Sequence, residues 1–209
     1  MFPIVLDLSS LPVILAGNGS QAARRLALLD DDGAGSVTVY APGPCEALAS
    51  AARSRLVRRW PTSTEIASAR LLLIADGVEA SALSDLVAVA RAARTLVNVE
   101  DRPALSDFHS PAVVRRGELL VTVSTGGRSP ALARRLARFL GEVFGSEWQA
   151  RLKDLAALRG QWREAGADPS MVSAWTEAWV DRHGQLPSES EAAAAVIRQT
   201  GRPNLAAAS

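Results

Sequence analysis

Two glycines near the start of the chain have the spacing of a loop that binds a nucleotide phosphate. Gly17, Gly19 and Ala22 fit the pattern G-x-G-x-x-[GA], between an apolar run and a stretch rich in Ala, Arg and Leu. The first glycine permits a tight turn, the second lets the backbone approach a pyrophosphate, and the small third residue allows close packing of helix on strand. The following helix N-terminus would offer free N–H groups and a positive dipole end to the phosphates. The alternative is a plain turn between a strand and a helix.

The elements that must position this loop follow the order of a βαβ unit. The run "PVILAG" predicts a buried strand, "SQAARRLALLDDDGAG" a helix and "SVTVYAP" a second strand. Further strands are predicted at "RLVRRW", "ARLLLIADG" and "LVNVED", with helices at "CEALASAARS" and "ASALSDLVAVARAARTL". Alternating strands and helices predict an α/β fold, with a Rossmann-like, mostly parallel sheet covered by helices on both faces.

The pattern changes after Asp101. The stretch "PAVVRRGELLVTVSTGG" predicts a pair of strands, and a helix should follow with Ser129 as its N-cap and Pro130 at its first position. Two strands that follow a complete Rossmann unit need a partner for their edges, which favours a dimer. We expect a dinucleotide-binding, Rossmann-like domain at 1–107, a small dimerisation region at 108–145 and a helical C-terminal region at 146–209.

Composition narrows the possible partners and the compartment. The 209 residues carry a formal net charge of +1, which argues against nucleic acid as the main partner. The N-terminus does not read as a signal peptide, and no apolar run reaches the roughly 18 residues of a membrane span. With Cys45 as the single cysteine and two histidines, we expect a cytoplasmic protein without a disulfide or a resident metal site.

The stretch "VNVEDRPALSDFHSPAVVRRGELLVTVSTGGRSPALARRLA" contains three motifs in a fixed order: NVxD, F-x-x-P and S-[ST]-G-G-x-S-P-x-L-A-R. With "FPIVLDL", "VILAGNGSQAARR" and "VTVYAP", these motifs make the chain resemble the precorrin-2 dehydrogenases of siroheme synthesis, including the N-terminal part of siroheme synthase. The matching elements run in order from about Phe2 to Leu140, and "FPIVLDL" corresponds to the family's opening strand.

This resemblance implies an enzyme that oxidises precorrin-2 to sirohydrochlorin with NAD as its cofactor. Some members of the family also insert ferrous iron, so a bifunctional dehydrogenase and ferrochelatase is an alternative function. A non-catalytic, dinucleotide-binding relative is an alternative of a different class. The family fold is a Rossmann domain, a dimerisation region and a helical region, and its interlocked subunits imply a homodimer.

The resemblance places the family's catalytic aspartate at Asp101. This residue ends the predicted strand "LVNVED", and functional residues of open α/β sheets gather at the carboxyl ends of strands. Its carboxylate could accept a proton as the macrocycle loses a hydride, and His109 could assist. The alternatives are an aspartate that only stabilises a turn before Pro103 and a structural histidine.

The cofactor-binding residues follow from the glycine loop and from the resemblance. A classical NAD site has Asp or Glu about 20 residues after the loop, whereas this chain has Tyr40, Ala41 and Pro42 there. It also has Asp76 where the family usually has Thr, and Glu100 where the family usually has an aliphatic residue. An acid beside a pyrophosphate is repulsive unless it faces away or touches ribose. The expected cofactor-binding residues are Gly17, Asn18, Gly19, Ser20, Gln21, Ala22, Ala41, Pro42, Ala75, Asp76 and Val99.

The predicted substrate carries many carboxylates, which arginine guanidinium groups can bind with two hydrogen bonds at once. A polar, glycine-rich loop before the helix of 130–143 could hold a further carboxylate at that N-terminus. The alternatives are a solvated helix face and a plain N-cap loop. The expected substrate-binding residues are Arg115, Arg116, Ser124, Thr125, Gly126, Gly127 and Arg128.

Overall fold

The computed structural model describes residues 2–183, and these form two compact units. The first unit contains residues 2–110 and 126–128, and the second contains 111–125 and 129–183. The first stretch of this unit ends at 110, and the predicted boundary at 107 stays a prediction. The division of the remainder at 145 stays a prediction, and the part of the predicted C-terminal region after residue 183 lies outside the described residues.

The first unit is built on a parallel sheet of five strands in the order β3-β2-β1-β4-β5. The strands are β1 (Pro12–Ala16), β2 (Ser36–Tyr40), β3 (Leu56–Val57), β4 (Leu71–Ile74) and β5 (Leu96–Val99). Ala16 at the end of β1 lies opposite Tyr40 of β2 and Ile74 of β4. The strand order reverses between β1 and β4, and ligands of such sheets bind in the crevice outside the carboxyl ends at that point. The predicted Rossmann-like fold is confirmed.

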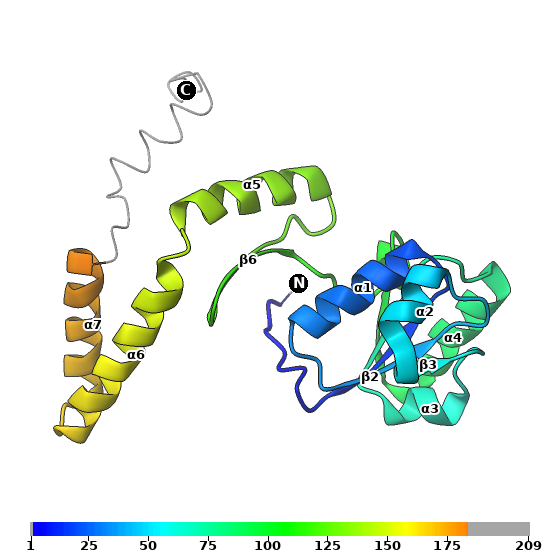
Figure 1. Ribbon diagram of the computed structural model, residues 1–209, viewed down its shortest axis with the longest axis horizontal. Coiled ribbons are helices and arrows are strands. Elements are labelled where there is room, and N and C mark those ends of the chain that lie inside the picture. Colours follow the sequence, from blue (N-terminus) through cyan, green and yellow to red (C-terminus); the bar gives the residue numbers. More distant parts are fainter. Residues whose placement is uncertain (1, 184–209) are drawn as a thin grey trace, which may run out of the picture. The chain divides into compact units, whose positions relative to one another are not determined.

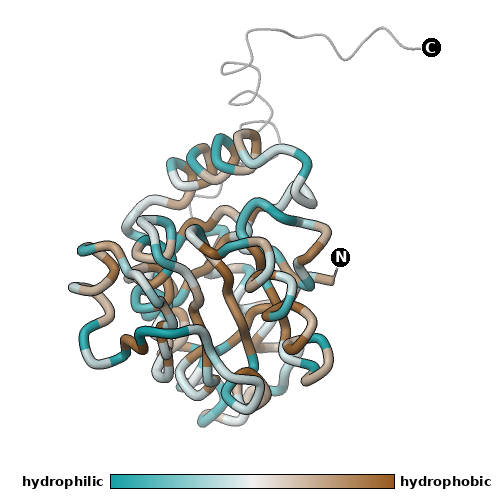
Figure 2. Tube along the Cα trace, turned by 90° about the vertical axis from the view of Figure 1, so that its right-hand side faces the viewer, coloured by the Kyte–Doolittle hydropathy of each residue, from teal (hydrophilic) through white to brown (hydrophobic). Residues whose placement is uncertain are grey.

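Helices cover both faces of this sheet (Figure 1). Leu26 of α1 (Ser20–Asp31) and Leu48 of α2 (Glu46–Ala52) pack with one set of alternate strand residues. Ile66 of α3 (Ser63–Ser68) and Leu86 of α4 (Ala80–Ala93) pack with the other set. Figure 2 colours the central strands brown, as expected for strands that are buried on both faces.

Helix α3 was not among the predicted helices, although the sequence contains a signal for it. Thr62 accepts a hydrogen bond from the Glu65 N–H (3.3 Å), and Glu65 accepts one from the Thr62 N–H (2.7 Å). This is a capping box, and its T-x-x-E spacing marks a helix start. The helix is only 6 residues long, so it has too few apolar positions to show a helical period.

The expected opening strand at "FPIVLDL" is wrong for the described structure. Residues 2–7 form no strand, and the side chains of Phe2, Ile4 and Val5 are exposed. Both sides of β1 are already paired, with β2 and β4, and Pro3 lacks the N–H that a sheet ladder needs.

The second unit begins with the antiparallel pair β6 (Ala112–Arg116) and β7 (Leu119–Val123). Helix α5 (Pro130–Val143) packs on both strands, and the Ser129 hydroxyl accepts a hydrogen bond from the Leu132 N–H (3.3 Å) at its start. The predicted strand pair, N-cap and first-turn proline are confirmed.

Helices α6 (Trp148–Glu164) and α7 (Pro169–His183) pack against each other, with an edge-to-face contact between Trp162 and Trp175. None of the helices in the described part of the chain is both long enough and apolar enough to cross a bilayer. The short 3₁₀ turns of the first unit lie at Arg53–Arg55 and Pro103–Leu105.

Candidate active site

Gly17 allows the loop after β1 to lie close to α1 and to the loop after β4. A Cβ atom at Gly17 would lie 3.1 Å from the methyl carbons of Ala22 and Ala75 and from the Asp76 carbonyl oxygen. Such contacts are tighter than a packed core tolerates without a shift. The first glycine is therefore required by close packing, and its φ is not in the left-handed region. Ala22 is fully buried in this contact, as the small third residue of the pattern predicts.

Asn18 ties together the three loops that follow β1, β2 and β4. Its side-chain amide donates to the Gly77 carbonyl (2.8 Å), and its side-chain oxygen accepts from the Gly43 N–H (3.0 Å). Its backbone N–H donates to the Asp76 carbonyl (2.9 Å), and its carbonyl accepts from the Cys45 N–H (2.7 Å). Asn18 therefore shapes the crevice by holding its walls together.

The carboxylate of Asp76 occupies the N-terminus of α1. Its Oδ2 accepts from the Gln21 N–H (3.2 Å), and its Oδ1 accepts from the Ala22 N–H (3.0 Å). Gly19 is the N-cap residue and has no side chain to cap the helix, so the loop after β4 supplies the cap. The Asp76 carboxylate thus lies at the helix end where a phosphate would bind, because the positive end of the helix attracts it.

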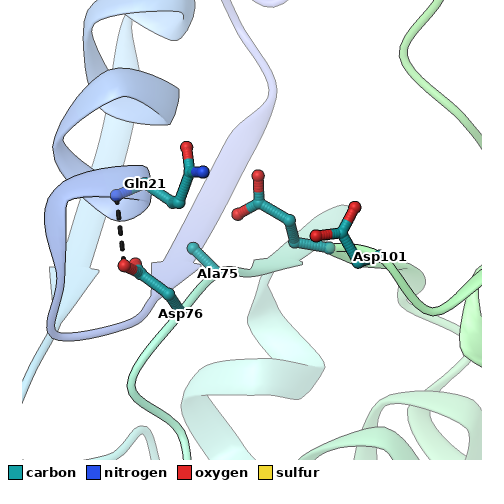
Figure 3. A pocket seen from close by; sticks show the side chains of 5 residues that line it. Gln21, Ala75, Asp76 and Asp101 are labelled. Carbon is teal, nitrogen blue, oxygen red and sulfur yellow. Dashed lines mark hydrogen bonds between the residues drawn. The ribbon is translucent and has the colours of Figure 1, made fainter. Parts of the chain in front are cut away.

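Five residues line a pocket beside this contact: Gln21, Ala75, Asp76, Glu100 and Asp101. Figure 3 shows the Asp76 side chain directed at the first turn of α1, with Asp101 on the segment that follows β5. Asp101 is exposed and has φ +54°, a left-handed conformation that Asp and Asn adopt more readily than most residues. Asp101 lies in a turn directly after β5, where such a conformation is common for Asp, and its catalytic role stays a prediction.

Glu100 is a pocket residue that the sequence prediction left out of the site. Burial raises the pKa of its carboxyl, Arg25 acts against that shift, and the nearby charges of Asp101 and Asp76 add to it. Its Oε2 atom is buried without a hydrogen-bond partner among the described residues. The replacement of the family's aliphatic residue by Glu was the signal that could have marked this position.

The segment that carries His109 is held beside β5 by hydrogen bonds. Asp107 accepts from the Val97 N–H (2.9 Å), Ser106 accepts from the Val99 N–H (2.9 Å), and the Asn98 amide donates to the Phe108 carbonyl (2.8 Å). His109 itself is half-buried and does not line the pocket of Asp101. Its assisting role stays a prediction.

The end of β2 carries a second group of charges that the sequence prediction missed. The Arg59 guanidinium lies 5.5 Å from the centre of the Tyr40 ring and makes two hydrogen bonds to Glu65 (2.8 and 2.7 Å). Arg59 and the Thr62 N–H lower the pKa of the Glu65 carboxyl far below its usual range. Ala41 beside them is buried, whereas Pro42 is exposed.

The predicted substrate residues are distributed over both units. Arg115, Arg116, Ser124 and Thr125 belong to the second unit, whereas Gly126, Gly127 and Arg128 belong to the first. Arg116 donates to the carbonyls of Phe144 (2.6 Å) and Gly141 (2.7 Å) at the end of α5. Its guanidinium therefore stabilises the C-terminus of this helix. Thr125 accepts from the Ser129 N–H (3.1 Å).

Among residues 2–183, no group of three His, Cys, Asp or Glu is arranged to hold a metal ion.

Comparison with known proteins finds a family model that covers most of the first unit. The family model described as "Putative NAD(P)-binding" matches residues 4–112, which is just over half of the chain. The chain belongs to this NAD(P)-binding family. The matched residues include the glycine loop, Asp76, Asp101 and His109, and the family implies a nicotinamide dinucleotide as cofactor.

Relatives with longer chains agree with the predicted resemblance. Siroheme synthases of Methylococcus capsulatus (37% identity over 169 residues), Methylobacillus flagellatus (34% over 165) and Nitrosospira multiformis (32% over 216) match 78–90% of this NAD(P)-binding chain. The chain spans only 34–45% of the length of these relatives. The solved structure titled "SirC, precorrin-2 dehydrogenase" shares the fold, with a TM-score of 0.70, 21% identity, and coverage of 96% of this chain and 99% of that one.

The α1 N-terminus has the donors that a dinucleotide phosphate requires. These donors can hold an anion, because the N–H groups of Gln21 and Ala22 already donate hydrogen bonds to the carboxylate of Asp76. Gly19 has no Cβ atom, and the Asp76 carboxylate fills the space that one would occupy. The residues therefore fit a nicotinamide dinucleotide once the Asp76 carboxylate leaves this position to the phosphate.

Proposed function

We propose that the chain catalyses the NAD-dependent oxidation of precorrin-2 to sirohydrochlorin in siroheme synthesis. The observation that carries the proposal is the placement of Asp101 and the start of α1 on one pocket of a Rossmann-like unit. The similarity to siroheme synthases and the fold shared with a precorrin-2 dehydrogenase support this substrate.

Different residues of the crevice have different roles in the proposed reaction: some bind the cofactor and one removes a proton from the substrate. Gly17 and Gly19 give the backbone room, and the N–H groups of Gln21 and Ala22 would hold a phosphate of the cofactor. When bound, the nicotinamide would supply the acceptor for the hydride that the macrocycle loses. The oxidation also releases one proton from precorrin-2, and the Asp101 carboxylate is the base that we assign to it.

Features at the end of β2 favour NAD over NADP in this proposal. An arginine that recognises the 2′-phosphate of NADP needs a guanidinium directed at that phosphate. Arg59, which lies next to Tyr40, already directs two of its nitrogens at Glu65. An added phosphate would have to compete with this carboxylate for the same donors.

The proposed enzyme acts in the cytoplasm as a homodimer. Val113 of β6 and Leu132 and Leu136 of α5 are 47%, 48% and 41% exposed, so the second unit exposes several apolar side chains. Burial of such side chains between two copies is favourable. Arg115 and Arg128 are exposed in their respective units and are the cations that we assign to the substrate carboxylates.

Purified protein mixed with precorrin-2 and NAD⁺ tests the proposal. We expect the absorbance of sirohydrochlorin to appear together with NADH, and NADP⁺ to support a slower reaction. Addition of Fe²⁺ to the product in the same cuvette tests the predicted alternative ferrochelatase activity. An intact, folded protein that forms no sirohydrochlorin under these conditions would overturn the assignment.

A further inference from the structure

The Asp76 carboxylate is placed where the phosphate of a dinucleotide would bind. It accepts both of the hydrogen bonds that the Gln21 and Ala22 N–H groups donate. A Cβ atom built on Gly19 would lie 2.6 Å from Cγ of Asp76, so the open side of the glycine is filled by this carboxylate. The first turn of α1 contains no acidic residue of its own. Asp76 thus serves as the anion of this helix end.

The backbone of Asp76 is held by a hydrogen bond to the glycine loop. The two hydrogen bonds from Gln21 and Ala22 hold its side chain. The Asn18 N–H donates to the Asp76 carbonyl, and the Asn18 amide donates to the next carbonyl, of Gly77. Gly77 has φ +75°, and a Cβ there would lie 2.9 Å from Cβ of Asn18. The loop is therefore packed against the glycine loop, and the carboxylate can leave the helix end by rotation of the side chain.

We propose that Asp76 sets the affinity of the dinucleotide site by acting as an internal competitor of the cofactor phosphate. This inference rests on the proposed cofactor site, and it makes Asp76 a residue that determines affinity for the cofactor. A phosphate and the Asp76 carboxylate cannot both accept hydrogen bonds from the same two N–H groups at once. The pocket lining includes two more carboxylates, Glu100 and Asp101, so a displaced Asp76 adds to the negative charge that an incoming phosphate meets there. The charges of Arg24 and Arg25 act on Glu100 in the opposite direction, and they offset part of this repulsion.

Variants of Asp76 test the proposal with measurements that need no substrate. Asp76→Ala removes the carboxylate, and Asp76→Asn keeps its shape without the charge. Asp85→Ala, at an exposed position on α4, is the control for the loss of one negative charge. Calorimetric titration with NAD⁺ and with inorganic pyrophosphate measures affinity, and thermal melting of the free protein measures the effect of losing the cap.

We expect Asp76→Ala to bind NAD⁺ and pyrophosphate at least about fivefold more tightly than the wild type, the factor that one charge at about 4 Å produces even at the dielectric constant of water. The same variant should melt at a lower temperature when free, because α1 loses its cap. Asp76→Asn should also bind more tightly, and Asp85→Ala should match the wild type.

Equal or weaker binding of both probes by Asp76→Ala would overturn the inference and leave the proposed function standing if the wild type binds NAD⁺. Tighter binding of pyrophosphate without any binding of NAD⁺ would support the role of Asp76 and overturn the proposed cofactor. A folded Asp76→Ala variant that binds neither probe would overturn both.

Discussion

At the scale of single residues, Asp101 combines a proposed chemical role with an unusual backbone conformation. Its φ of +54° is tolerated by Asp, Asn and Gly, whereas Ala at a left-handed position costs roughly 1 kcal/mol. Loss of the carboxylate and strain of the turn can therefore be separated by the choice of variant.

We expect Asp101→Asn and Asp101→Gly to lose about 10²–10⁴-fold in sirohydrochlorin formation, because both lack the general base. Both should keep the melting temperature of the wild type within a few degrees, and Asp101→Ala should melt lower. Steady-state kinetics and thermal melting of the three variants give the comparison. Turnover of Asp101→Asn above about a tenth of the wild type would show that Asp101 is a structural turn residue.

The partly buried carboxyl of Glu100 makes the fold less stable as the pH rises. Burial raises the pKa of its carboxyl in the folded state, so the folded protein binds this proton more tightly than the unfolded chain. The stability linked to protonated Glu100 is present below about pH 4.3, the ordinary pKa of glutamic acid, and is lost as the pH rises through the folded-state pKa.

Glu100→Gln removes this penalty and should raise the melting temperature at pH 7 relative to the wild type. The difference from the wild type should shrink towards pH 4. Thermal melting followed by circular dichroism across this pH range measures it. A difference that stays constant with pH would mean that the charge of Glu100 is not its cause.

The glycine spacing selected Gly17 and Ala22, and the ends of the predicted strands together with the family resemblance selected Asp76 and Asp101. These signals were insufficient to give the direction of the Asp76 side chain or the conformation of Asp101. The Asp76 contact with Ala22 joins residues 54 positions apart, and it depends on how closely the loop after β4 approaches α1. Such a distance is set by the packing of the whole sheet, which no local pattern records.

At the scale of elements, the predicted strands and helices formed where their apolar patterns were long enough. Helix α3 formed without a predicted helical pattern because a capping box starts it, and segment 2–7 formed no strand because it has no partner strand. The sequence also did not indicate that Arg116 of β6 would bind the last carbonyls of α5.

We expect Arg116→Ala to destabilise the second unit by about 1–3 kcal/mol, because the charged hydrogen bonds to Phe144 and Gly141 are lost. Arg116→Lys keeps the charge but not the fork of donors, so its stability should fall in between. Urea unfolding monitored by circular dichroism measures this order. Unchanged stability together with a raised KM for precorrin-2 would instead support the predicted substrate role.

At the scale of the whole molecule, the second unit exposes apolar residues that a second copy would cover. Leu132 and Leu136 lie one turn apart on α5, and both are more than 40% exposed. Light scattering at micromolar concentration should give the mass of a homodimer for the wild type. Leu136→Glu should shift the mass towards the monomer because it places a charge in the apolar contact, whereas Ala88→Glu on the exposed side of α4 should leave it unchanged. A monomeric wild type would contradict the predicted dimer.

The ties that Asn18 makes have a consequence for motion in the native state. Its amide, carbonyl and side chain connect Gly43, Cys45, Asp76 and Gly77, so none of the three loops can open alone without breaking bonds to the others. The amide hydrogens of Asn18, Gly43 and Cys45 should therefore exchange with deuterium at similar rates, through one shared opening event. Asn18→Ala should speed up the exchange of Gly43 and Cys45 together, although these residues follow a different strand.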